Sequence, residues 1–192
     1  MERSGVAPEA ELSGDLEAVP VAQTLADLDA RGACGSLLLF GDVLRGELVV
    51  CAPRVVDAST NLRRGHDAAL RLLWLERGRF AFPERPASPA ADAGWPIAAL
   101  LREAVEVRAE LLRLGSRAPS NTDRVEIDDP AAALAAFPGS EAWAAVVRDG
   151  RRGVVVAELA VELAMSTYAC RAAIGRAAEA RMLHVMPGVP IN

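Results

Sequence analysis

Three cysteines and two histidines are the residues of this chain best suited to metal binding or nucleophilic catalysis. Cys34, Cys51 and His66 could act as metal ligands, but their spacings match no zinc pattern and no fourth ligand is apparent. Cys51 and His66 are no better placed as nucleophile and base, because neither lies in an electropositive or glycine-rich segment. An odd number of cysteines with no CxxC pair also argues against a disulfide framework. We therefore expect packed thiols, a surface or capping histidine and no metal site.

Phosphate binding and acid/base catalysis find no better support in the sequence. The segment Arg31–Ser36 (RGACGS) lacks the glycine spacing of nucleotide-binding loops, and all 21 basic residues are arginine, so no lysine can reach a phosphate. Carboxylate pairs such as Asp27 with Asp29, or Glu103 with Glu106, fall on the polar faces of predicted helices. We therefore expect a protein that is not an enzyme and needs no cofactor.

Composition points to a globular protein without a basic body. The 192 residues are 52% hydrophobic and carry a formal net charge of −5. Residues 1–124 hold 15 Arg against 18 Asp and Glu, a net charge of −3, and residues 125–192 hold 6 against 8, a net charge of −2. Neither part would attract a phosphate backbone over long range. No signal pattern opens the chain and no window approaches about 18 apolar residues, so we expect a cytoplasmic location and no membrane insertion.

The stretch Arg64–Pro83 (RGHDAALRLLWLERGRFAFP) predicts a helix that leads into a strand. Its apolar residues first recur at helical spacing and then alternate at strand spacing after Gly78, a residue type common at helix C-caps. The helical positions are Ala69, Leu72, Leu73, Trp74 and Leu75, and the strand positions are Phe80 and Phe82. We expect these three aromatic residues to lie in a core.

The neighbouring segments predict a small mixed unit around this stretch. We expect a first helix from Val21 to the stop at Gly32, a buried strand at Ser36–Phe40, and two further strands at Arg45–Cys51 and Arg54–Ala58 with a turn near Pro53. The proline-rich stretch after Phe82 predicts the end of the sheet. A strongly amphipathic helix over Ile97–Leu114 then stops at Gly115.

This order of elements, with the wording GDL…PVAQTLADL…CGSLLL…GELVV…VVDAS…RGHDAALRLLWLERGRFAF, resembles the PATAN domain family over roughly Gly14 to Leu114. The family is named for the amino-terminal region of a cyanobacterial response regulator and occurs in bacterial signalling and cell-polarity proteins. The resemblance implies an interaction module. It suggests partners among response regulators, polarity scaffolds or small Ras-like GTPases.

The remainder of the chain resembles a winged helix. We expect a helix at Glu141–Arg148, a strand at Gly153–Val156, helices at Ala157–Ala164 and Thr167–Arg181, and a last strand at Leu183–Met186. Ser166 is well placed to cap the longer helix. This order also resembles the small winged-helix modules that accompany PATAN regions.

The longer helix is a poor reader of DNA bases. Cys170, Ala173, Ile174 and Ala177 are expected to face the core, which leaves Ala169, Arg171, Ala172, Gly175, Arg176 and Glu179 outside. Bases are read by Arg, Lys, Asn or Gln, and only two arginines are available on this surface. Only nine residues follow Leu183, too few for a two-stranded wing with a basic tip. Nucleic acid is therefore disfavoured as a partner without being excluded; its candidate contacts are Arg151, Arg152, Arg171 and Arg176.

The sequence thus predicts an α+β protein: a small, mainly antiparallel sheet with helices, followed by a winged helix-turn-helix-like unit. Its expected parts are a flexible leader at 1–12, a PATAN-like domain at 13–115, a linker at 116–124 and a winged-helix-like domain at 125–192. The favoured function is a non-enzymatic bacterial signalling or scaffold adaptor that binds another protein, and homodimerisation stays open. The alternative is a transcriptional regulator that binds DNA. A polar cluster at Thr60–Asp67, which we call the polar joint, connects the expected strand at Arg54–Ala58 to the second helix. The candidate partner-binding residues lie in it: Asn61, Arg63, Arg64 and His66.

Overall fold

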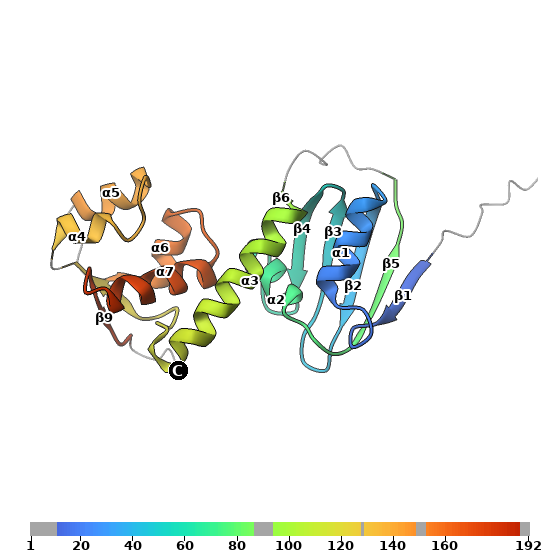
Figure 1. The fold of residues 1–192 in the computed structure, drawn as a ribbon, viewed down its shortest axis with the longest axis horizontal. Coiled ribbons are helices and arrows are strands. Elements are labelled where there is room, and N and C mark those ends of the chain that lie inside the picture. Colours follow the sequence, from blue (N-terminus) through green and yellow to red (C-terminus); the bar gives the residue numbers. More distant parts are fainter. Residues whose placement is uncertain (1–10, 87–93, 128, 149–152, 189–192) are drawn as a thin grey trace, which may run out of the picture. The chain divides into compact units, whose positions relative to one another are not determined.

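The computed structural model describes residues 11–86, 94–127, 129–148 and 153–188 (Figure 1). The chain divides into two compact units, Met1–Ala104 and Val105–Asn192. The predicted α+β class is confirmed, because the first unit contains a six-stranded antiparallel sheet and the second a three-stranded antiparallel sheet, each packed with helices. The unit boundary falls inside helix α3 (Ile97–Leu114), and the expected linker at 116–124 lies within the second unit.

The sheet of the first unit has the strand order β1-β5-β2-β3-β4-β6. The bounds are β1 Glu11–Asp15, β2 Cys34–Phe40, β3 Arg45–Cys51, β4 Arg54–Thr60, β5 Arg79–Pro83 and β6 Trp95–Pro96. The three strands expected before the second helix are therefore present, and the aromatic strand lies between β1 and β2.

Side-chain alternation divides this sheet into two unlike faces. Leu37 and Leu39 of β2 and Leu48 and Val50 of β3 point to one face, where all four are buried. Helices α1 (Val21–Ala30), α2 (His66–Leu73) and the first turns of α3 pack on this face, and Figure 1 shows α1 lying across the sheet. No described helix of this unit covers the opposite face, which carries Phe40.

Gly46 lets α2 approach this covered face closely. A Cβ atom at this position of β3 would lie 2.9 Å from Cδ2 of Leu72, which is fully buried. A larger residue would push α2 away from the sheet.

Helix α2 is shorter than its sequence pattern predicts. Trp74 and Leu75, expected inside the helix, follow its last residue, and Trp74 is the C-cap. Gly78 is not a helix cap: its φ of +127° opens β5, where the backbone passes close to Phe40 O. Trp74 is only half-buried, but its indole N–H donates to Ala104 O of α3 at 2.9 Å. The indole thus links the end of the α2 segment to α3.

The expectation that the sheet ends after Phe82 is wrong. The chain returns as β6, which pairs with β4 through Arg54↔Pro96 and Val55↔Trp95. At the other edge, β1 begins at Glu11, so the last two residues of the expected leader belong to the sheet; residues 1–10 lie outside the described residues.

Cys34 and Cys51, expected as separate packed thiols, form a disulfide. They face each other directly across β2 and β3, with their Cα atoms 4.1 Å apart. Such opposition depends on the register of two strands, which the cysteine count does not reveal.

The second unit contains the expected helix, strand, helix, helix, strand order. These elements are α5 Glu141–Arg148, β8 Val154–Val155, α6 Val156–Glu162, α7 Thr167–Glu179 and β9 His184–Met186. Ser166 caps α7 as predicted, because its Oγ accepts from the Ala169 N–H at 3.0 Å.

Three elements of this unit were not predicted. A short 3-10 helix at Gly115–Arg117 follows α3, and α4 (Pro130–Leu134) precedes α5. Strand β7 (Arg124–Glu126) is the centre of the sheet order β8-β7-β9. The third strand therefore comes from before the helices and not from a wing after them.

The core of the first unit generates a stability prediction. Phe80, 5% exposed, packs on the covered face of the sheet, whereas Phe40 is 46% exposed on the other face. Phe80→Ala should lower the free energy of unfolding by about 3–5 kcal/mol, as truncations of buried aromatics do. Phe40→Ala is the matched control and should cost about 1 kcal/mol. Urea denaturation of both variants checks this; equal losses would contradict the assignment of the two faces.

Candidate functional site

The polar joint between β4 and α2 is a tight, self-bonded turn. Thr60 Oγ1 accepts from the backbone N–H groups of Leu62 and Arg63, at 3.2 and 2.9 Å. The Asn61 N–H donates to Arg45 O at 3.1 Å, so the joint is fastened to the first residue of β3. Its backbone is therefore positioned by the sheet and does not hang free.

The four candidate partner-binding residues have different surroundings. Asn61 and Arg64 are exposed. Arg63 forms an ion pair with Asp67, four residues later, at 2.7 Å between Nη1 and Oδ2. This pair lies at the start of α2, where the carboxylate of Asp67 also interacts favourably with the positive end of the helix dipole. Arg63 therefore helps to hold the joint, and Arg64 is the arginine that faces solvent.

His66 is packed against neighbouring residues and does not project from the surface. Its Nε2 lies 2.8 Å from Oε2 of Glu103 in α3, and its ring stacks on Trp95 with centroids 5.1 Å apart. Glu103, expected on a solvated helix face, thus reaches α2. The histidine joins α2, α3 and β6 within the first unit.

Two large apolar side chains that the sequence analysis did not select lie at the same end of the sheet. Val43, in the turn between β2 and β3, is 85% exposed, and Leu62, in the joint, is 75% exposed. Together with Asn61 and Arg64 they form what we call the strand-end patch. Isolated apolar residues in a turn carry no periodic signal, so only the pairing of β3 with β4 shows that they share one end of the sheet.

The candidate DNA contacts do not form a free basic surface on the described residues. Arg151 and Arg152 lie outside them. On α7, Arg171 donates from Nε to Pro119 O, and Arg176 Nη1 lies 3.8 Å from Oε1 of Glu110. Both described arginines of α7 therefore have contacts within the second unit.

The outer face of α7 is covered in part. Ala172 and Gly175, expected outside, are both buried, Ala172 to 1% exposure. A Cβ atom on Gly175 would lie 2.5 Å from Cδ1 of Leu114, the last residue of α3. The end of α3 therefore packs against α7 at Gly175, because a position without a side chain permits close approach. The expected core residues Cys170, Ala173, Ile174 and Ala177 are buried as predicted.

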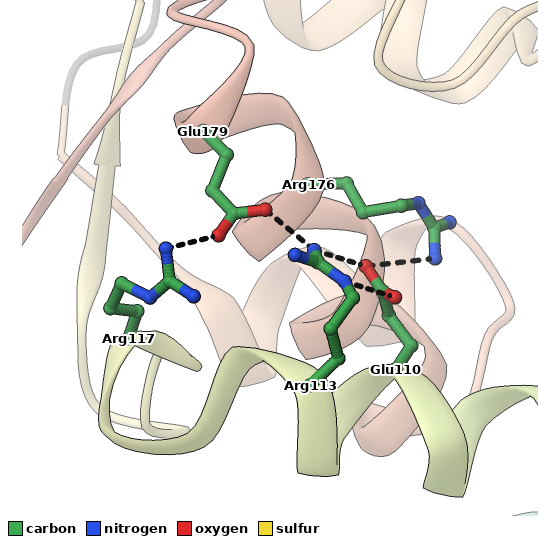
Figure 2. A network of polar contacts seen from close by, with 5 residues as sticks. All are labelled: Glu110, Arg113, Arg117, Arg176 and Glu179. Carbon is green, nitrogen blue, oxygen red and sulfur yellow. Dashed lines mark hydrogen bonds and ion pairs between the residues drawn. The ribbon is translucent and has the colours of Figure 1, made fainter.

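Ion pairs continue this contact at the surface (Figure 2). Arg113 Nη2 lies 2.8 Å from Oε1 of Glu110 and 2.5 Å from Oε2 of Glu179, and Arg117 Nη1 lies 2.7 Å from Oε1 of Glu179. Hydrogen bonds from Arg113 hold the pKa values of both carboxyl groups below their ordinary value of 4.5. The same bonds raise the pKa of Arg113. The network joins α3, the 3-10 helix and α7 of the second unit.

Cysteine chemistry has no support in this geometry. Cys34 and Cys51 are bonded to each other, and burial raises the pKa of the Cys170 thiol to about 12. Among the described residues, no group of three or more His, Cys, Asp or Glu side chains could hold a metal ion.

A search of the described helices finds none that is both long and apolar enough to span a membrane.

Comparisons with known proteins add no identification. No protein-family model matches the chain, and neither the curated proteins nor the solved structures contain a significant match.

The network in Figure 2 generates a pH prediction. Carboxylates whose pKa is lowered by folding stabilise the fold above the unfolded value, about 4.5, and this contribution is lost as the pH falls through the lowered folded pKa. Arg113→Gln should therefore lower the urea midpoint at pH 7, and the difference from the native protein should shrink below about pH 4.5. Arg148→Gln, at an exposed position of α5, is the control. A difference in urea midpoint between the native protein and Arg113→Gln that stays constant with pH would contradict the network.

Proposed function

We propose that the protein is a non-enzymatic bacterial signalling adaptor that acts by binding another protein. The observation that carries this proposal is the burial of Ala172 and Gly175 on the outer face of α7, with Leu114 of α3 placed against Gly175. A winged helix that reads DNA must place this face in the major groove. Here Ala172 and Gly175 are buried, and the described arginines of α7 contact Pro119 and Glu110. This geometry supports a packing role for α7 over a reading role.

The strand-end patch supplies a surface with the composition of a protein contact. It combines two exposed apolar side chains, Val43 and Leu62, with the exposed guanidinium of Arg64 and the amide of Asn61. Arginine is enriched at the centres of protein interfaces, and recognition is common on loops held by a rigid scaffold. The hydrogen bonds of the Thr60–Arg63 turn provide that rigidity.

The resemblance to the PATAN family agrees with this proposal. It suggests a response regulator, a polarity scaffold or a small Ras-like GTPase as the partner. The transcriptional regulator is the second candidate, favoured by the helix, strand, helix, helix, strand order of the second unit.

The proposal predicts which substitutions weaken partner capture. Leu62→Ser combined with Arg64→Ala should reduce the affinity for the partner about thirtyfold, corresponding to a loss of about 2 kcal/mol at a central contact, with an unchanged melting temperature. Val161→Ser with Arg148→Ala, an exposed pair in the second unit, is the matched control. The measurement is a quantitative pull-down from an extract of the source organism, with mass spectrometry.

Two results would contradict the proposal. Equal recovery of the partner by the native protein and the Leu62→Ser, Arg64→Ala variant would remove the strand-end patch from the interface. Sequence-dependent duplex DNA binding far tighter than the roughly 10⁻⁴ to 10⁻⁶ M of non-specific binding would favour the regulator.

A further inference from the structure

The face of the six-stranded sheet opposite the helices carries an ordered row of side chains near its Phe40 end. Phe40 of β2 lies directly opposite Arg45 of β3 on one side and Arg79 of β5 on the other. Residues directly opposite one another in adjacent strands share a face, with Cβ atoms about 4.5–5.5 Å apart. One half-exposed aromatic ring is therefore flanked by two guanidinium groups.

Both arginines of this row are available to a ligand. Arg45 and Arg79 are exposed, and neither forms an ion pair with any of the described residues. Asp15 of β1 lies opposite Arg79, but its Oδ1 accepts the Glu17 N–H at 2.8 Å. The row therefore presents two guanidinium groups without an ion-pair partner among the described residues, one on each side of an aromatic ring.

A hollow lies beside the row. Its volume is about 390 Å³, and it is lined by Ser13, Phe40, Arg79, Phe80 and Ala81. It is large enough to receive one side chain of a ligand, and Phe40 and Arg79 of the row are both among its lining residues.

We propose that this row binds an extended acidic segment of a partner protein, with one apolar side chain in the hollow and carboxylates on Arg45 and Arg79. In an extended segment, residues two positions apart point to the same side. An apolar residue with an acidic residue two positions before and two positions after it would thus match the row. Planar guanidinium groups bind carboxylates in a bidentate manner. This inference rests on the protein-binding function proposed above and adds the chemistry of the partner.

Two other occupants fit the same surface less well. A second copy of the chain placed symmetrically on this face would bring the two arginine-bearing rows together, which like charges oppose. A single-stranded nucleic acid could stack on Phe40, but its backbone needs a continuous cationic track. Glu47 and Asp57 lie on the same face by register and confine the positive charge to the row, which can take two carboxylates but not a longer polyanion.

The test is a selection from a displayed library of random linear peptides on the full-length protein. We expect enriched sequences to contain an apolar residue flanked by Asp or Glu. Phe40→Ser should weaken the best enriched peptide about thirtyfold, as loss of a central aromatic contact does. Arg45→Glu with Arg79→Glu should instead enrich basic flanking residues. Arg148→Glu with Arg181→Glu, the same charge change at exposed positions of the second unit, should leave the acidic pattern intact.

The thermal transition of each variant is compared with that of the native protein, so that only folded variants are scored. The proposal is overturned if no sequence is enriched, if the charge reversal leaves the selected pattern unchanged, or if a single-stranded oligonucleotide binds in a Phe40-dependent manner. Retention of a protein partner from the extract by the Arg45→Glu, Arg79→Glu variant would reject this row alone. If the native protein captures no protein partner from the extract, the adaptor function itself is rejected.

Discussion

The packing of Leu114 against Gly175 is the contact that joins the end of α3 to the outer face of α7 in the second unit. Because position 175 has no side chain, the end of α3 lies directly on α7 there, and Ala172, three residues earlier, is also buried. The carboxylates of Glu110 and Glu179 and the guanidinium of Arg113 then close the edge of this interface with ion pairs. Exposed ion pairs of this kind each contribute little to stability. The apolar contact therefore determines where α3 meets α7, and the ion pairs add to it. A helix in the sequence position of a DNA reader is thereby used as a packing surface.

In the first unit, the corresponding constraint is the unequal covering of the sheet. Alternation places Leu37, Leu39, Leu48 and Val50 under the helices, and the same alternation leaves Phe40, Arg45 and Arg79 on the other side. The Asn61 N–H of the polar joint donates to Arg45 O, so the strand-end patch and the row of Phe40, Arg45 and Arg79 meet at Arg45. Both proposed contact surfaces thus follow from one arrangement of strands.

Local patterns predicted much of this fold. The alternation of Phe80 and Phe82, the apolar run of β2 and the capping serine at 166 each depend on neighbouring residues, and each element formed where expected. The features that were missed depend on distant partners. The two residues of β6 have no period of their own and form a strand only because β4 offers an edge. Gly175 is packed against Leu114, which lies roughly 60 residues earlier in the chain at the end of α3. The sequence predicts Phe40 only as part of a buried strand. Because Phe40 lies one residue after Leu39 and three after Leu37, alternation places it on the opposite face from both leucines, which could have indicated its exposure.

The accessibility of position 172 reports directly whether the outer face of α7 is covered. A cysteine introduced as Ala172→Cys should react with a bulky maleimide as slowly as the buried native Cys170, because Ala172 is 1% exposed. Ala109→Cys, on the exposed side of α3, should react rapidly under the same conditions. The ratio of the two labelling rates in folded protein is the measured quantity. If the outer face of α7 is covered at position 172, labelling is slow there and rapid at position 109. Equally rapid labelling at both positions would contradict this covering and return α7 to the candidates for DNA recognition.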